Sequence, residues 1–119
     1  MIHEMSLNSA PFEKIKTGEK SIEIRLYDEK RRGVRIGDVI IFSKLPEKTE
    51  KIRVEVVGLS VFKSFHDLFS NFEKSKFGHE QNLNIEEQIN RQREHYTEDE
   101  EQQYGVIGIH IKLVKTPGN

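Results

Sequence analysis

Three charged side chains lie close together in the segment TGEKSIEIR, residues 17–25. They are Lys20, Glu23 and Arg25. In a strand, Glu23 and Arg25 point to the same side, about 6–7 Å apart, and a turn before the strand can bring the Lys20 amine toward Glu23. A carboxylate between an ammonium and a guanidinium stays ionised. The spacing therefore favours one wall of a polar site.

Such a trio can do three kinds of chemistry. The guanidinium of Arg25 can bind a phosphate or the carbonyl-bearing edge of a base. The carboxylate of Glu23 can accept a hydrogen bond from an exocyclic amine or act as a general base. Lys20, if desolvated, can lose its proton and serve as a base or nucleophile. The alternative interpretation is an exposed ladder of salt bridges, which contributes little stability and no chemistry.

A short basic loop follows this segment. It contains Lys30, Arg31, Arg32 and Arg35. Residues 1–63 carry 13 Lys and Arg against 10 Asp and Glu, whereas residues 64–119 carry 6 against 10. The first part of the chain is thus positive and the second negative, which suits an anionic ligand on one side. A solvated loop on a charge-rich protein is the alternative.

The composition excludes several kinds of site. The 119 residues suit one domain, which we expect over residues 1–114, with a frayed tail at residues 115–119. Cysteine is absent, which excludes disulfides, thiolate catalysis and Cys-type zinc sites. The five histidines show no HExxH spacing, and no Gly-rich phosphate loop or GxSxG motif occurs, so we expect no metal and no cofactor. Without a signal peptide or a long apolar run, we expect a cytoplasmic protein with no membrane partner.

Hydrophobic periodicity predicts strands first, then helices, then a closing strand. Alternation predicts strands at residues 2–7, 20–27, 39–42, 52–62 and 104–114, with a bulge at Gly58. Capping signals predict helices beginning near residues 9, 65, 85 and 98. This order predicts an α+β fold: a small, mostly antiparallel β-barrel with two or three covering helices, closed by pairing of the final strand with an early one.

The N-terminal half resembles a known family. The stretch HEMSLNSAPFEKIKTGEKSIEIRLYDEKRRGVRIGDVIIF is similar to the first half of an ASCH domain, a relative of the PUA RNA-binding domain. The shared pattern is a helix ending in Gly, then G-x-K-[TS]-x-E-x-R, then a G-D turn, represented here by Gly18, Lys20, Ser21, Glu23, Arg25, Gly37 and Asp38. The closing YGVIGIHIKL resembles the last strand of the family. The resemblance implies a PUA-like barrel with a cleft lined by the Lys-Glu-Arg stretch, and RNA or a modified nucleoside as the ligand.

One branch of the family that resembles this chain hydrolyses acetylated cytidine with a Lys, a Thr and a Glu. The resemblance places Lys20 at the position of that Lys and Glu80 at the position of that Glu. Glu23 occupies the position of the catalytic Thr, so that nucleophile is missing, and Ser21 lies two residues earlier. An amidohydrolase of this chain would therefore rely on Lys20, Ser21, Glu23 and Glu80.

Three functional hypotheses follow. In the first, an RNA-binding module uses Arg25 and the loop from Lys30 to Arg35 for phosphate and Glu23 for a base amine, while Tyr27, on the same strand face, can stack on the base. In the second, Lys20 activates Ser21 or water to hydrolyse an acylated nucleoside. A protein-binding domain without a nucleic-acid ligand is the third. Of the three, only the first, in which phosphate contacts dominate binding, requires the affinity to fall steeply with added salt. The sequence does not indicate an oligomeric state.

Overall fold

The computed structural model describes residues 1–114. Its strands are β1 (Ile2–Leu7), β2 (Ile22–Leu26), β3 (Val39–Lys44), β4 (Lys51–Phe62) and β5 (Val106–Leu113). Its helices are α1 (Ser9–Thr17), α2 (Glu29–Arg32), α3 (Phe65–Asn71), the 3-10 helix η1 (Lys74–Phe77), α4 (Ile85–Gln92) and α5 (Glu98–Tyr104). The tail expected at residues 115–119 lies outside the described residues.

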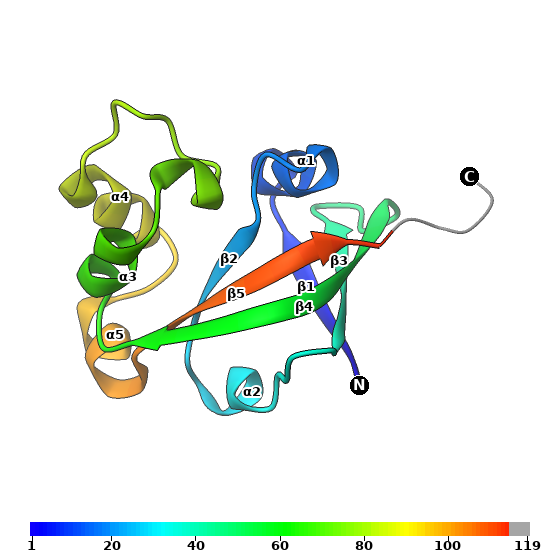
Figure 1. Ribbon diagram of the computed structural model, residues 1–119, viewed down its shortest axis with the longest axis horizontal. Coiled ribbons are helices and arrows are strands. Elements are labelled where there is room, and N and C mark those ends of the chain that lie inside the picture. Colours follow the sequence, from blue (N-terminus) through cyan, green and yellow to red (C-terminus); the bar gives the residue numbers. More distant parts are fainter. Residues whose placement is uncertain (115–119) are drawn as a thin grey trace.

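The strands form a single curled sheet in the order β1-β3-β4-β5-β2. Only β1 and β3 pair in parallel; the other three pairs are antiparallel. The long strands β4 and β5 cross the molecule side by side and join the β1–β3 end to the group formed by α3, α4 and α5 (Figure 1). The predicted α+β class with a mostly antiparallel, barrel-like sheet is confirmed, as is the pairing of the last strand with an early one, β2. That pairing does not complete a closed barrel, because β1 and β2 are the two edges of the sheet.

The predicted bulge is present in β4. The register of β4 against β5 shifts between Val56 and Gly58. A side chain at Gly58 would have its Cβ 3.2 Å from the Cβ of His110, so glycine lets the two strands approach closely without displacing the His110 side chain. The bulge bends the sheet.

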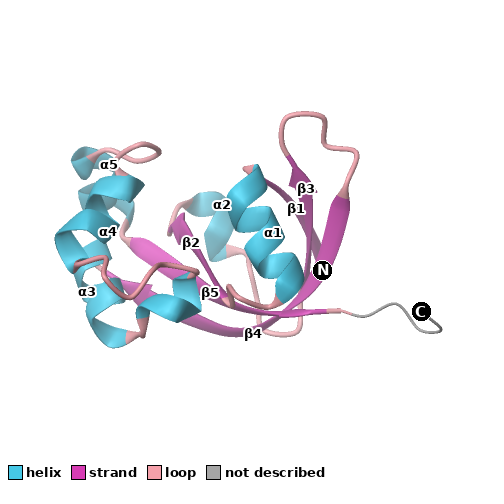
Figure 2. Cartoon of the chain, turned by 90° about the horizontal axis from the view of Figure 1, so that it is seen from above, coloured by secondary structure: helices cyan, strands magenta, loops and turns pink. Residues whose placement is uncertain are grey.

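Two hydrophobic clusters lie on opposite faces of the curled sheet. The first fills the inside of the curl and includes Phe12 and Ile15 of α1 with Ile107 and Ile109 of β5. The second lies between the sheet and α3, η1, α4 and α5, and is built from Ile22, Ile24, Leu26, Phe65, Leu68, Phe69, Phe77 and Val106. Figure 2 shows α1 on one side of β5 and β2, apart from the group of α3, α4 and α5.

Helices α3, α4 and α5 begin where the capping signals predict. The side chains of Asn84 and Thr97 each accept from the backbone N–H three residues later, and Glu87 and Glu100 return the bond in complete capping boxes. Residues 73–82, for which no capping signal predicts a helix, contain the short 3-10 helix η1.

No helix of residues 1–114 combines the length and the apolar character needed to cross a membrane. Within the same residues, no group of three His, Asp or Glu side chains is arranged to hold a metal ion.

Candidate functional site

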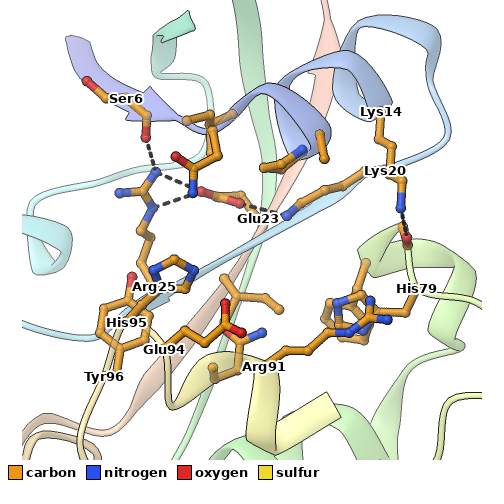
Figure 3. A pocket seen from close by; sticks show the side chains of 18 of the residues that line it. Ser6, Lys14, Lys20, Glu23, Arg25, His79, Arg91, Glu94, His95 and Tyr96 are labelled. Carbon is orange, nitrogen blue, oxygen red and sulfur yellow. Dashed lines mark hydrogen bonds and ion pairs between the residues drawn. The ribbon is translucent and has the colours of Figure 1, made fainter. Parts of the chain in front are cut away.

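A cleft of about 580 Å³ opens between the two edges of the sheet. One wall comes from the end of β1, α1 and the start of β2, and the other from residues 77–79 and 91–96 (Figure 3). Its polar residues are Ser6, Asn8, Lys14, Lys20, Glu23, Arg25, His79, Arg91, Gln92, Glu94, His95 and Tyr96.

The predicted trio converges on one wall of this cleft. Lys20 Nζ lies 3.0 Å from Glu23 Oε1, and Arg25 Nε donates to Glu23 Oε2 at 2.8 Å. Glu23 is only 3% exposed. Burial by itself raises the pKa of the Glu23 carboxyl, but the Lys20 ammonium and the Arg25 guanidinium outweigh it and hold that pKa below its ordinary value. The carboxylate is therefore ionised at neutral pH.

The register of β2 explains why the trio points inward. Glu23 lies opposite Ile109 and Arg25 opposite Ile107, so the two charged side chains share the inner face of the curl with the core isoleucines. The chain reaches this strand through the left-handed Gly18, after which the Lys20 N–H donates to the Lys14 carbonyl at 3.0 Å. This turn places the Lys20 amine beside Glu23.

Both sheet edges at the cleft have main-chain groups without a strand partner. The bonds from Ile111 N to Ser21 O and from Tyr27 N to Gly105 O show that the odd-numbered residues of β2 pair with β5. The N–H and C=O of Ile24 therefore face the open edge. On β1 the even-numbered residues face outward in the same way, and the Ser6 carbonyl there accepts from Arg25 Nη2 at 3.0 Å. Arg25 thus links the two edges across the cleft.

His79 lies on the opposite wall. Burial, followed by the nearby Lys20 ammonium, lowers the pKa of the His79 imidazole to about 4, so the ring is neutral at pH 7. Its Nδ1 lies 3.0 Å from Nε2 of the fully buried Gln88. With Nδ1 accepting from this amide, the ring proton is on Nε2, which can donate to a ligand.

The tyrosine that lines the cleft is Tyr96, not Tyr27, and Phe77 lines the cleft as well. Tyr96 stacks on Phe65 with ring centroids 6.0 Å apart, and burial raises the pKa of its hydroxyl. Tyr27 packs against the inner core, and the Arg32 guanidinium lies over its ring at 4.8 Å. The position of Tyr96 depends on how α4 and α5 pack against β2, which no local pattern indicates.

Ser21 and Glu80 do not line the cleft. The main chain of Ser21 is bonded to Lys76 and Ile111, which holds it at the entry to β2. The Glu80 carboxylate pairs with Arg91 at 3.1 Å and is about half exposed. Of the residues expected for an amidohydrolase, only Lys20 and Glu23 come together in the cleft.

The basic loop divides into two parts. Lys30 and Arg31 line a second hollow that adjoins Arg25, and Arg31 also pairs with Asp28 at 3.2 Å. Arg32 and Arg35 line neither hollow, because the short helix α2 turns them away toward carbonyls of their own loop, Tyr27 O and Arg32 O.

Known proteins resemble both the sequence and the fold. The family model described as ASCH domain matches residues 5–115. The crystal structure of hypothetical protein PH0355 is 36% identical, with a TM-score of 0.83, and the match covers 96% of this chain and all of that one. The solution structure of protein PF0455 from Pyrococcus furiosus is also 36% identical, with a TM-score of 0.76 over 98% of this chain and all of that one. No curated protein matches the chain significantly.

A more distant structure shares the fold alone. The ASCH domain from Lactobacillus crispatus is 15% identical, with a TM-score of 0.63 over 94% of this chain and 79% of that one.

Proposed function

Because this chain belongs to the ASCH domain family, we propose that it binds RNA or a modified nucleoside and holds one unpaired base in the cleft beside Lys20, Glu23 and Arg25. The observation that carries this proposal is an ionised, buried carboxylate held between two cations on the wall of an open cleft. The cleft volume of about 580 Å³ lies within the range typical of small-ligand sites. Base recognition in single-stranded RNA combines such polar edges with aromatic surfaces.

The side chains around the cleft offer complementary groups to a base. Glu23 Oε1 has one protein partner, Lys20, whereas Oε2 lies 2.8 Å from both Nε and Nη2 of Arg25. Oε1 therefore keeps an acceptor position for an exocyclic amine. Neutral His79 can donate to a ring nitrogen or carbonyl. Tyr96, with Phe65 behind it, provides aromatic surface of the kind on which bases stack.

Ligand titration followed by backbone amide NMR tests this proposal. We expect cytidine, adenosine or short single-stranded RNA to shift the amide signals of residues 20–25, 79 and 96. Glu23→Gln should weaken the binding on the order of tenfold, as expected for one lost charge-assisted hydrogen bond. Glu55→Gln, at an exposed glutamate of β4, is the matched control and should change nothing. Shifts confined to surfaces away from the cleft would overturn the proposal.

A second candidate rests on the contact between Lys20 and Glu23 inside the cleft. These two groups can position and activate a water molecule for hydrolysis of an acylated nucleoside such as acetylcytidine. Incubation with acetylcytidine should then release acetate, and Lys20→Met should abolish the release. Absence of acetate from the wild-type protein would leave the binding function alone.

A further inference from the structure

A second hollow follows the open edge of β1. It adjoins the cleft, and both share Ser6 and Arg25 as wall residues. Its other lining residues come from β1, α2, the end of β3, the turn from β3 to β4 and the start of β4: Glu4, Met5, Lys30, Arg31, Ser43, Lys48 and Lys51. A ligand that fills the cleft and extends past Arg25 enters this hollow.

The charge of this second hollow is strongly positive. Its walls carry five cationic side chains, Arg25, Lys30, Arg31, Lys48 and Lys51, against the one carboxylate of Glu4, and two of the five, Arg25 and Arg31, are paired with Glu23 and Asp28. Among residues 1–114, Lys30, Lys48 and Lys51 take part in no ion pair, whereas Lys16 and Lys44 nearby are paired with glutamates. Unpaired cations that gather around a concavity favour an anionic ligand.

Arg25 lines both hollows and still has one nitrogen that can donate to a ligand. Its Nε and Nη2 bond to Glu23 and Ser6, while Nη1 has no hydrogen-bond partner within the described residues. The Ser6 N–H lies on the open edge of β1, since β3 bonds to the odd-numbered residues of that strand, as the bond from Leu45 N to Leu7 O shows. A donor from each sheet edge is therefore available beside the lysines.

We propose that this second hollow binds the phosphodiester adjacent to the base held in the cleft, with Lys48 and Lys51 as phosphate-binding residues. This inference rests on the proposed function. It assigns the phosphate to Lys30, Lys48, Lys51 and Nη1 of Arg25, and not to Arg32 or Arg35, which lie outside both hollows. The ligand class is then a nucleotide or short RNA with at least one phosphate next to the bound base.

Two double variants, each of which removes two positive charges, distinguish binding in this hollow from a general effect of the charge of the protein. Lys48→Gln with Lys51→Gln removes two cations from the hollow, and Arg32→Gln with Arg35→Gln removes two exposed cations outside it. The probes are cytidine, cytidine 5′-monophosphate and a cytidine trinucleotide of RNA. Binding is measured by calorimetry between about 50 and 200 mM salt, a range over which each phosphate contact changes affinity appreciably. Thermal unfolding checks that both variants are folded.

For the trinucleotide, the Lys48/Lys51 variant should bind on the order of tenfold more weakly at low salt, and its salt slope should fall by up to about 0.7, the value for one phosphate of a single strand. Its affinity for cytidine should be unchanged, and the Arg32/Arg35 variant should match the wild type throughout. If the monophosphate shows the same loss as the trinucleotide, the hollow binds a terminal phosphate as well as a phosphodiester, which supports the assignment of the site.

Equal losses in the two variants, or none in the Lys48/Lys51 variant, would overturn the inference while leaving the cleft proposal intact. Failure of the wild type to bind any of the three probes would overturn both.

Discussion

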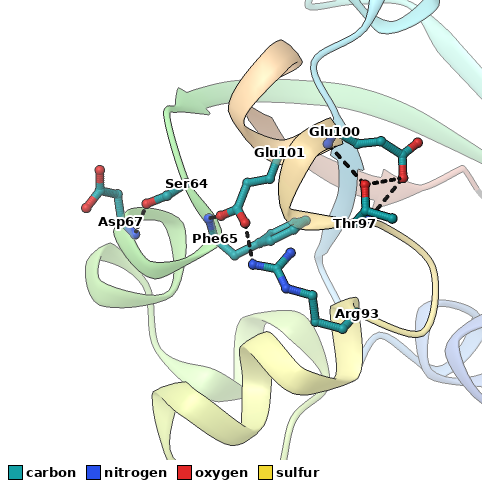
Figure 4. A network of polar contacts seen from close by, with 7 residues as sticks. All are labelled: Ser64, Phe65, Asp67, Arg93, Thr97, Glu100 and Glu101. Atoms are coloured by element: carbon teal, nitrogen blue, oxygen red, sulfur yellow. Dashed lines mark hydrogen bonds and ion pairs between the residues drawn. The ribbon is translucent and has the colours of Figure 1, made fainter.

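Two buried glutamates of this protein have similar surroundings and different uses. Glu23 and Glu101 are 3% and 8% exposed, and each carboxylate has two partners. Glu101 accepts from the backbone N–H of Phe65 at 2.7 Å and pairs with Arg93, whose guanidinium lies over the Phe65 ring (Figure 4). Glu101 borders neither hollow, whereas Glu23 forms part of the cleft wall.

The difference lies in what each carboxylate connects. The partners of Glu101 come from α3 and from the end of α4, so it fixes three helices against one another. The partners of Glu23 are its neighbours Lys20 and Arg25, which a short strand would bring near it in any case. A buried carboxylate that joins distant elements has a structural reason to be there. One that only gathers local charges beside a cleft is a candidate for ligand binding.

The largest expected effect is the loss of stability in Glu101→Ala. The change leaves the Arg93 charge and the Phe65 N–H without a partner, so the free energy of unfolding should fall by about 3 kcal/mol. Urea denaturation measures it, with the exposed Glu98→Ala of the same helix as the control. Ligand affinity of the folded variant should fall less than in Glu23→Gln, because Glu101 borders neither hollow. A loss below about 1 kcal/mol would remove the structural role assigned to Glu101.

Glu23→Gln should lower the free energy of unfolding less, by about 2 kcal/mol, while it weakens ligand binding. The amide oxygen can still accept from one cation, and both cations border the open cleft. Urea denaturation and the ligand titration are carried out on the same sample. If stability falls more than in Glu101→Ala while affinity is kept, the contrast between the two glutamates is reversed.

As the pH falls, protonation of His79 should lower the stability of the protein before protonation of Glu23 does. The pKa of His79 is lowered from 6.5 to about 4, so the unfolded chain takes up this proton first and stability falls as the pH drops from 6.5 toward 4. His79→Gln should reduce the slope of the free energy of unfolding against pH. The part of the slope that remains comes from His110, because burial also lowers its pKa. The contribution of Glu23, present above pH 4.5, is lost only below that value, as the pH falls through its lowered pKa. An unchanged slope between pH 6.5 and 4.5 in His79→Gln would contradict the assignment.

The smallest effect is expected for Arg25→Lys. A lysine keeps the charge beside Glu23 but cannot bond to Glu23 and the Ser6 carbonyl together, because it lacks the planar fork. The stability loss should be about 0.5–1 kcal/mol, against almost none for the exposed Arg53→Lys. Faster amide hydrogen exchange in β1 and β2 would show the loosened link between the edges, and exchange identical to the wild type would argue against it.

Local patterns in the sequence predict the strands, the caps and the Lys20–Glu23–Arg25 cluster. Alternation along β2 and β5 fixes which face is apolar, and the spacing of Glu23 and Arg25 follows from strand geometry. The opposite wall is not predictable in this way. His79 and Tyr96 reach the cleft only because η1, α4 and α5 pack against the second cluster, an arrangement set by tertiary contacts.

The basic loop shows the same limit. Four cations in six positions suggest one patch, but α2 places Lys30 and Arg31 at the second hollow and turns Arg32 and Arg35 elsewhere. Lys48 joins the first two from a polar turn and Lys51 from the start of β4, positions that carry no signal of their own in the sequence.

The gap between β1 and β2 has a consequence for solubility. Unpaired strand edges are templates on which a second molecule can add a strand, and they favour aggregation. Charged side chains that point inward at such an edge oppose this addition, because a neighbouring strand would have to bury them without their solvent. Glu23 and Arg25 occupy β2 in that manner, and Arg25 reaches across to β1. The same charges therefore oppose the pairing of β2 with a strand of a second molecule, while they leave the gap open.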